Sequence, residues 1–174
     1  MKRVIISLLA AIMVAGIGQI HAEKIEDRYV MRPIQGGLLY FILPYELPSL
    51  QKEKAVELDV TYITGFDSVR VNMSVYTDMP LATDSIVFRT EKSFRISDFE
   101  TFFIDKENKK YVHRYSCRFP YRYWQEMYVD SEPFCLEVYS SSGTLFYGFS
   151  SNKWKKEQQW MTQVMLLIER NNSK

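Results

Sequence analysis

The clearest pattern in this chain is a strict alternation of apolar and polar residues on both sides of a short break. Apolar residues occupy every second position over 56–62 and again over 69–75, with polar or charged residues between them. A period of two places alternate side chains on opposite faces of a strand. Residues 65–68, Gly-Phe-Asp-Ser, have the composition of a turn. The pattern predicts an antiparallel hairpin with one face in the core and the other face, which carries Glu57 and Asp59, in water.

Shorter runs predict further strands. The segment 38–43, LLYFIL, is apolar on both faces, as in a strand buried on both sides; Pro44 is expected to end it, with a loop up to Lys54. Residues 23–35 have a polar, mixed composition and are expected to be a lead-in. The remaining strands are expected at 85–89, 93–96, 102–105, 111–119, 134–139 and 144–149.

Two segments have helical features. Pro120 suits the first position of a short helix that reaches about Tyr128. From Ser151 to Arg170 there is no proline or glycine, and the apolar residues follow helical spacing: Trp154, Met161, Val164, Met165 and Ile168. We expect this second helix, at about 152–170, to cover the domain's own sheet rather than a membrane or a partner's groove.

These elements predict a mainly β fold. It is an antiparallel β-sandwich or a partly open barrel of about seven to nine strands, with a C-terminal amphipathic α-helix packed on it. Neither an internal repeat nor a linker rich in proline, glycine or serine interrupts the chain. The expected organisation is therefore a single β-rich domain over residues 23–174.

The first 22 residues have the layout of a secretory signal peptide. Lys2 and Arg3 precede an apolar run over 4–18, which is shorter than the roughly 20 residues that span a bilayer. The expected cut is near Ala22; Ala15 and Gly18 remain alternative sites, and an uncleaved N-terminal anchor is the alternative to cleavage. The chain is thus predicted to be exported to the periplasm or the cell exterior, with no transmembrane segment once the signal is removed.

Charge and composition narrow the function classes. The chain has 22 basic and 21 acidic side chains, and loss of Lys2 and Arg3 changes the net charge from +1 to −1. A near-neutral chain does not bind a phosphate backbone through bulk charge, so nucleic acid is not an expected partner. Aromatic residues make up 15% of the chain, which favours ordered sheet over a disordered segment.

Cys117 and Cys135 are the two cysteines of the chain, and export permits them to form a disulfide. Strand phasing favours two separate thiols, because Cys135 falls between Phe134 and Leu136 and is out of phase with the apolar residues of its strand. Both outcomes remain open from the sequence.

Residues suited to catalysis are few. His113 is the only histidine that remains after signal cleavage, and its place among aromatic residues is typical of a packed core histidine. It lies too far along its own strand from Cys117, about 13 Å, to act on it directly. Acidic residues fall on a polar strand face or in turns, and no motif for a nucleophile, a metal ion, a phosphate or a dinucleotide occurs. We therefore expect no catalytic residues, no metal and no cofactor.

The segment with the strongest functional character lies between Tyr111 and Tyr128, where tyrosine and tryptophan interleave with arginine. Such residues are favoured at protein interfaces, and exposed rings can stack on sugars; buried, the same residues form an aromatic core. The candidate ligand-binding residues are Tyr121, Arg122, Tyr123, Trp124 and Tyr128.

Three functions follow in order of preference. The first is a non-enzymatic exported domain that binds another envelope or extracellular protein. The second is a glycan-binding module that uses an exposed Tyr/Trp/Arg surface, and the third is a carboxylate-based hydrolase. Exposure of the three aromatic rings at 121, 123 and 124 would favour the glycan, whereas a hydrolase needs two acids facing one another across a pocket.

Overall fold

The computed structural model describes residues 25–129 and 132–172, so the predicted signal peptide, residues 1–22, lies outside the described residues. Most of the described chain is strand. In chain order the elements are η1 (Ile25–Arg28, a 3-10 helix), β1 (Tyr29–Ile34), β2 (Gly37–Leu47), β3 (Val56–Ile63), β4 (Ser68–Thr77), β5 (Thr83–Arg89), β6 (Ser93–Ile96), β7 (Glu100–Glu107), β8 (Lys110–Pro120), α2 (Tyr121–Val129), β9 (Cys135–Ser140), β10 (Gly143–Gly148) and α3 (Ser151–Asn172).

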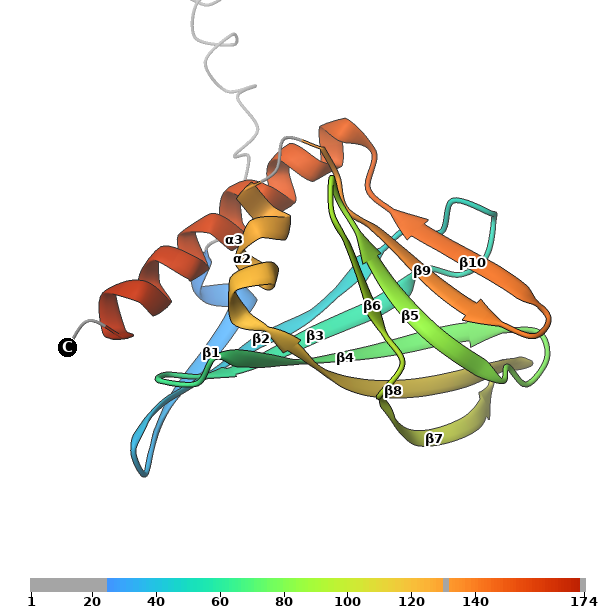
Figure 1. Cartoon of the computed structure of the whole chain (residues 1–174), viewed down its shortest axis with the longest axis horizontal. Coiled ribbons are helices and arrows are strands. Elements are labelled where there is room, and N and C mark those ends of the chain that lie inside the picture. Colours follow the sequence, from blue (N-terminus) through green and yellow to red (C-terminus); the bar gives the residue numbers. More distant parts are fainter. Residues whose placement is uncertain (1–24, 130–131, 173–174) are drawn as a thin grey trace, which may run out of the picture.

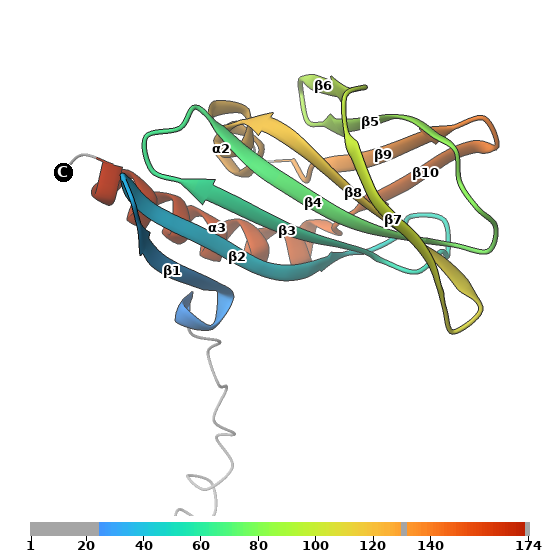
Figure 2. The ribbon, with the colours of Figure 1, turned by 90° about the horizontal axis from the view of Figure 1, so that it is seen from below.

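The strands form two antiparallel sheets. Sheet A has the order β1-β2-β3-β4-β8-β7, and sheet B has the order β10-β9-β5-β6. Sheet B and both α-helices lie on the same side of sheet A, which leaves the opposite face of sheet A without a covering layer of described residues (Figures 1 and 2). The predicted fold class, a β-sandwich with a C-terminal helix packed on it, is confirmed. The described residues contain ten strands, more than the expected number because β1 had been assigned to a polar lead-in.

The predicted hairpin is present as β3 and β4. The eight alternating apolar residues of the two strands are all buried, and they form the centre of the core. Gly65 in the connecting turn has a φ of +85°, a left-handed conformation that glycine adopts without steric cost. The alternation therefore predicted the hairpin and its inward face correctly.

The prediction that Pro44 ends its strand is wrong. Strand β2 continues to Leu47, and its pairing with β3 shifts register between Ile42 and Tyr45. Pro44 lies within that irregularity, where the ladder is already interrupted and a missing N–H costs no regular bond. The expected burial of both faces is also wrong: Tyr40 and Ile42 are buried, whereas Leu39 and Phe41 on the uncovered face are only half-buried.

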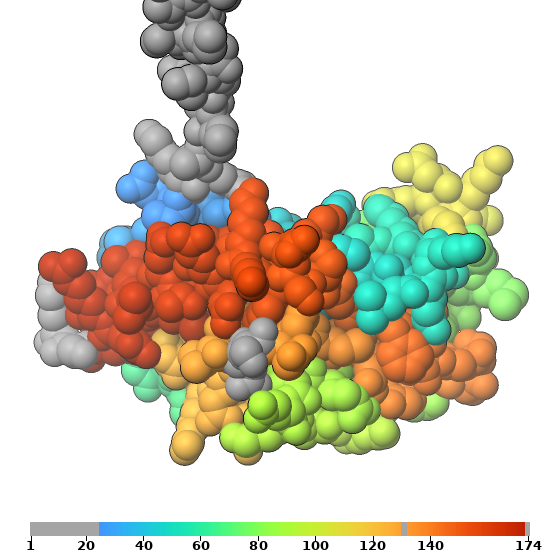
Figure 3. Space-filling view, turned by 90° about the horizontal axis from the view of Figure 1, so that it is seen from above, coloured from blue at the N-terminus to red at the C-terminus, as the bar shows by residue number. Residues whose placement is uncertain are grey.

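Two different layers cover the inner face of sheet A, one on each side of the sheet's centre. On the β2–β3 side the cover is helical: Trp160 of α3 meets Tyr45 edge-on at 5.9 Å, and the helix end donates from Asn171 Nδ2 to Tyr40 Oη at 2.5 Å. On the β8 side the cover is sheet B, where the ring of Phe88 lies 4.9 Å from that of Phe119. Figure 3, which views the molecule from above, shows α3 in red and orange-red on the face toward the viewer.

The polar face of the β3–β4 hairpin is not simply solvated, contrary to the expectation for Asp59. Asp59 is 2% exposed; it forms an ion pair with Arg114 and accepts a hydrogen bond from Asn72 Nδ2 at 2.6 Å. Glu57 is half-buried and accepts from Tyr76 Oη at 2.8 Å. The difference arises because Arg114 comes from β8, a strand 55 residues further along the chain. A buried carboxylate requires such a partner.

Both cysteines are free thiols in the structure. Cys117 points into the core from β8, and burial raises the pKa of its thiol to about 12. Cys135 lies on β9 between the fully buried Phe134 and Leu136, so its side chain projects from the opposite face of sheet B. The two thiols therefore point away from one another, as their strand phasing indicated.

Candidate functional site

Helix α2 distributes the five candidate residues over two faces. Trp124 and Tyr128 are each 1% exposed and belong to the core, and Tyr121 is half-buried. Tyr123 is 41% exposed, and the side chain of Arg122 is 88% exposed. An α-helix has 3.6 residues per turn, so positions 121, 124 and 128 share one face, whereas 122 and 123 lie outside it. Only Arg122 and Tyr123 are therefore open to a ligand at the surface.

The inward residues of α2 join it to the rest of the core. Tyr121 stacks on Tyr62 of β3 with 4.5 Å between ring centroids, and Tyr128 Oη shares a 2.7 Å hydrogen bond with Tyr45 Oη. Burial raises the pKa of Tyr121 and of Tyr128, so both phenols stay neutral. These rings hold α2 in place, and Trp124 packs between them.

The outward face of α2 borders a pocket of about 140 Å³, whose other side is the β5–β6 hairpin. The floor of this pocket is aromatic. Phe94 of β6 lies edge-on to Phe119 of β8 at 4.7 Å, and Phe88 of β5 lies 4.9 Å from Phe119 on the other side. Tyr123 continues the aromatic surface at 5.2 Å from Phe94. We call this hollow the α2–hairpin pocket; the hairpin and α2 lie next to one another in Figure 3.

Charged side chains form the rim of the α2–hairpin pocket. Lys92, at the tip of the hairpin, donates from Nζ to Glu126 Oε2 at 3.1 Å, and Arg122 donates from Nε to Glu126 Oε1 at 3.1 Å. The hydrogen bond from Lys92 is the main cause that holds the pKa of Glu126 below its ordinary value, and Arg122 adds to this effect. Glu126 is thus ionised at neutral pH and is not suited to deliver a proton as a general acid. Val129, 74% exposed, completes the mouth with an apolar side chain.

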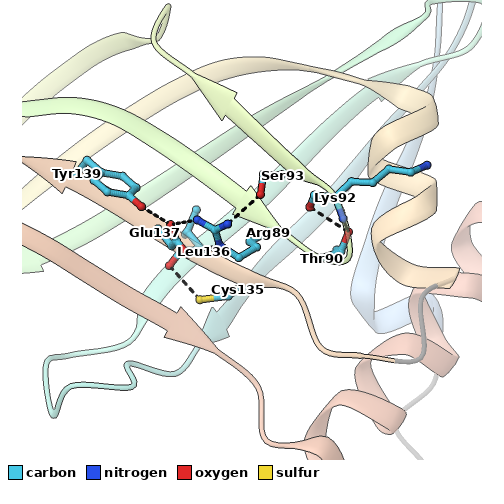
Figure 4. Close-up of polar contacts among 8 residues, drawn as sticks. All are labelled: Arg89, Thr90, Lys92, Ser93, Cys135, Leu136, Glu137 and Tyr139. Atoms are coloured by element: carbon cyan, nitrogen blue, oxygen red, sulfur yellow. Dashed lines mark hydrogen bonds and ion pairs between the residues drawn. The ribbon is translucent and has the colours of Figure 1, made fainter.

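The hairpin that forms one side of the pocket is braced by a polar cluster on sheet B. Arg89 binds Glu137 of β9 through two hydrogen bonds of 2.5 and 2.8 Å, and Tyr139 donates to the same carboxylate at 2.6 Å (Figure 4). The hydrogen bond from Arg89 is the main cause that lowers the pKa of Glu137. Arg89 also donates to Ser93 Oγ at 3.0 Å across the hairpin. Bidentate arginine–carboxylate pairs have a defined geometry, so this cluster orients the tip that carries Lys92.

His113, the histidine of the described residues, takes no part in the pocket. His113 is fully buried on β8, where its Nε2 accepts from the N–H of Leu81 in the β4–β5 connection at 3.3 Å and lies 3.0 Å from Thr77 Oγ1. Burial lowers its pKa, so the ring is neutral at pH 7. The interpretation of His113 as a packed core residue agrees with this position. Within the described ranges, no three His, Cys, Asp or Glu side chains lie close enough together to hold a metal ion.

Sequence reasoning identified Tyr123 and Arg122 but missed most of the pocket. Phe94, Lys92 and Val129 line the pocket but were not among the candidates. No local pattern could have grouped them, because the pocket joins the β5–β6 hairpin, the end of β8 and α2.

The chain was also compared with known proteins. No protein-family model, no curated protein sequence and no solved structure matches it. None of the described helices combines the length and apolar content needed to span a lipid bilayer.

Proposed function

We propose that this protein is exported and acts without catalysis, by binding another protein of the cell envelope or cell exterior. In this proposal the α2–hairpin pocket receives one large apolar side chain of the partner. The observation that carries the proposal is the aromatic floor formed by Phe88, Phe94 and Phe119, which opens to the surface beside Tyr123. Export itself is inferred from the first 22 residues, which have the pattern of a signal peptide.

The size and the lining of the pocket favour this kind of ligand. A cavity of about 150 Å³ with an apolar lining accommodates a benzene-sized group, and the α2–hairpin pocket is of similar volume, about 140 Å³. Apolar anchors that enter such pockets supply much of the affinity of protein interfaces. The ion pairs of Lys92 and Arg122 with Glu126 then form a polar rim around the anchor.

The two alternatives have less support. A glycan-binding surface needs several exposed rings, whereas of the candidate rings on α2 Trp124 is 1% exposed and Tyr123 alone is classed as exposed, at 41%. A carboxylate hydrolase needs one acid that stays protonated, whereas Lys92 and Arg122 lower the pKa of Glu126, one of the two acids that line the pocket. Protein binding is the function that the pocket supports best.

Photo-cross-linking in the cells that produce the protein tests the proposal. A benzophenone amino acid at position 123 should give one dominant covalent adduct with another protein. The same probe at Met79, which is 70% exposed in the β4–β5 connection, serves as the matched control and should not give that adduct. Val129→Asp, at an exposed position on the pocket mouth, should reduce the adduct at 123 by about tenfold. Equal adducts from both positions, or no effect of Val129→Asp, would contradict the proposal.

A further inference from the structure

The two edge strands of sheet A, β1 and β7, are exposed along nearly their whole length. Every residue of β7 is exposed, and five of the six residues of β1 are exposed. Of the twelve large hydrophobic residues that are exposed in the described part of the chain, six lie on these two strands: Val30, Met31, Ile34, Phe102, Phe103 and Ile104. Open edges with apolar side chains are templates for pairing with another strand.

Sheet B offers much less edge. Strand β6 has only four residues. The free side of β10 is covered by the segment after β2, where the Leu50 N–H donates to Phe146 O at 2.8 Å and the Gly148 N–H donates to Pro48 O at 2.9 Å. The open edges that invite strand pairing are therefore β1 and β7, at opposite ends of one sheet.

The topology of sheet A makes these two edges complementary in direction. Each of its six strands is antiparallel to its neighbour, so β1 and β7, the first and sixth in order, run in opposite directions. A second copy placed beside the first in the same orientation would present its β1 antiparallel to the first copy's β7. Antiparallel pairing of this kind continues the sheet without a change of pattern.

We propose that copies of this protein associate head to tail, with β7 of one copy paired antiparallel to β1 of the next. The hairpin turns define which backbone groups are available. Two-residue turns, Gln35-Gly36 and Asn108-Lys109, close the β1–β2 and β7–β8 hairpins. The pair next to such a turn exchanges hydrogen bonds, as does every second pair after it. Met31 and Pro33 on β1, and Ile104 and Lys106 on β7, thus direct their backbone groups to the open side.

One hydrogen bond in the structure agrees with this assignment. The Lys106 N–H has no strand partner and donates to its neighbour Asp105 Oδ1 at 2.7 Å. Pro33 has no N–H and contributes only its carbonyl, which is why a proline is tolerated at this edge. The bulge between Thr101 and Phe103 ends the regular part of β7, so 103–107 is the segment available for pairing.

Side-chain chemistry selects one register. When Met31 lies opposite Lys106, Arg32 lies opposite Asp105 and Ile34 lies opposite Phe103. Residues that pair directly in a sheet project from the same face. Arg32 pairs with Leu39 and Asp105 pairs with Val112, so both of the new pairs project from the uncovered face of sheet A. The register therefore joins opposite charges and apolar side chains on matching faces. Pairing of β7 with itself about Asp105 would instead place two carboxylates opposite one another.

A contact between two different surfaces does not close on itself by a two-fold axis, so it propagates from copy to copy. Sedimentation velocity of the chain, purified as the cell processes it, should show a mass that rises with protein concentration. Arg32→Asp and Asp105→Arg should each weaken the association by about tenfold or more. An equimolar mixture of the two variants should restore it, because each then finds a complementary edge on the other. Asp67→Arg, with the same change of charge at an exposed position between β3 and β4, is the control and should leave the mass unchanged.

Cysteine pairs test the register. The double variant Arg32→Cys, Asp105→Cys should yield a ladder of disulfide-linked multimers on mild oxidation, and reductant should remove it. Arg32→Cys combined with Glu107→Cys shifts the pair by two residues and should yield at least tenfold less. A chain that remains monomeric at millimolar concentration, a closed dimer that does not grow, or equal ladders from both pairs would overturn the proposal. Photo-cross-linking at position 123 reports on the α2–hairpin pocket separately.

Discussion

The two halves of the core that share sheet A differ in how they are covered. On one side sheet B covers β8 with strands that are far apart in the sequence; on the other side α2 and α3 cover β2 and β3. The α2–hairpin pocket lies at the junction of these covers, since its walls are α2 and the β5–β6 hairpin. The pocket is lined by residues from both covers, so neither cover would form it by itself.

The largest expected effect comes from a change in the sheet that both halves share. Val71 on β4 is 3% exposed, and Val71→Asp places a charge without a partner in the core. We expect loss of the cooperative fold in both halves, because the cost exceeds about 4 kcal/mol. Circular dichroism and thermal unfolding measure this. The control is Phe66→Asp, in a turn and 60% exposed, which should change stability by less than about 1 kcal/mol. A folded Val71→Asp variant would show that the two halves of the core do not depend on sheet A for their stability.

A smaller effect should be confined to the helical half. Trp154 of α3 is 1% exposed and packs against Tyr128 at 5.4 Å and Phe134 at 5.6 Å. Trp154→Ala should lower the free energy of unfolding by about 3–5 kcal/mol. Leu166→Ala on the same helix, where the residue is 59% exposed, should cost less than about 0.5 kcal/mol.

Urea unfolding measures both variants, and amide hydrogen exchange locates the loss. Exchange should accelerate first in α2 and α3 of Trp154→Ala. If β5 and β9 lose protection to the same extent, the two covers are one cooperative unit and the distinction between them does not hold.

The smallest effect is a pH dependence that belongs to the β8 side of the core, where His113 is buried. Burial lowers the pKa of His113 from its ordinary value of 6.5, so the unfolded chain takes up a proton more readily than the folded chain. Above pH 6.5 the His113 ring is neutral in both states and the free energy of unfolding does not depend on it. As the pH falls below 6.5, the free energy of unfolding decreases by at most about 1.4 kcal/mol per pH unit.

His113→Gln should remove this slope between pH 7.5 and pH 5, as measured by urea unfolding at each pH. The lowered pKa values of Glu126 and Glu137 do not interfere, because their ordinary value is 4.5 and their contributions are lost only at more acid pH. A slope that persists in His113→Gln would assign the pH dependence to another group.

The local pattern of apolar residues was enough to predict an element wherever the periodicity of that element alone defines its buried face. The alternation in β3 and β4 predicted both strands and their inward face, and the apolar stripe from Trp154 to Ile168 predicted α3. Pro44 misled the prediction of β2, because a proline ends a strand only where the ladder needs its N–H. The edge strand β1 was missed because its composition is mixed and its pairing depends on β2.

The candidate site was predicted only in part for a related reason. Helical periodicity from Tyr121 onward separates Trp124 from Tyr123, yet which face of α2 is buried depends on where α2 packs. Asp59 is the clearest case on a strand: its partner Arg114 comes from another strand, so its burial could not be inferred from its neighbours.

The sequence by itself determined the fold class, the central hairpin and the late helix, because these follow from the period and phase of apolar residues within single elements. Tertiary structure alone decided the covers of sheet A, the α2–hairpin pocket and the complementary edges β1 and β7. Each of these depends on residues that are distant along the chain, and their approach is set by sheet order and packing rather than by local periodicity.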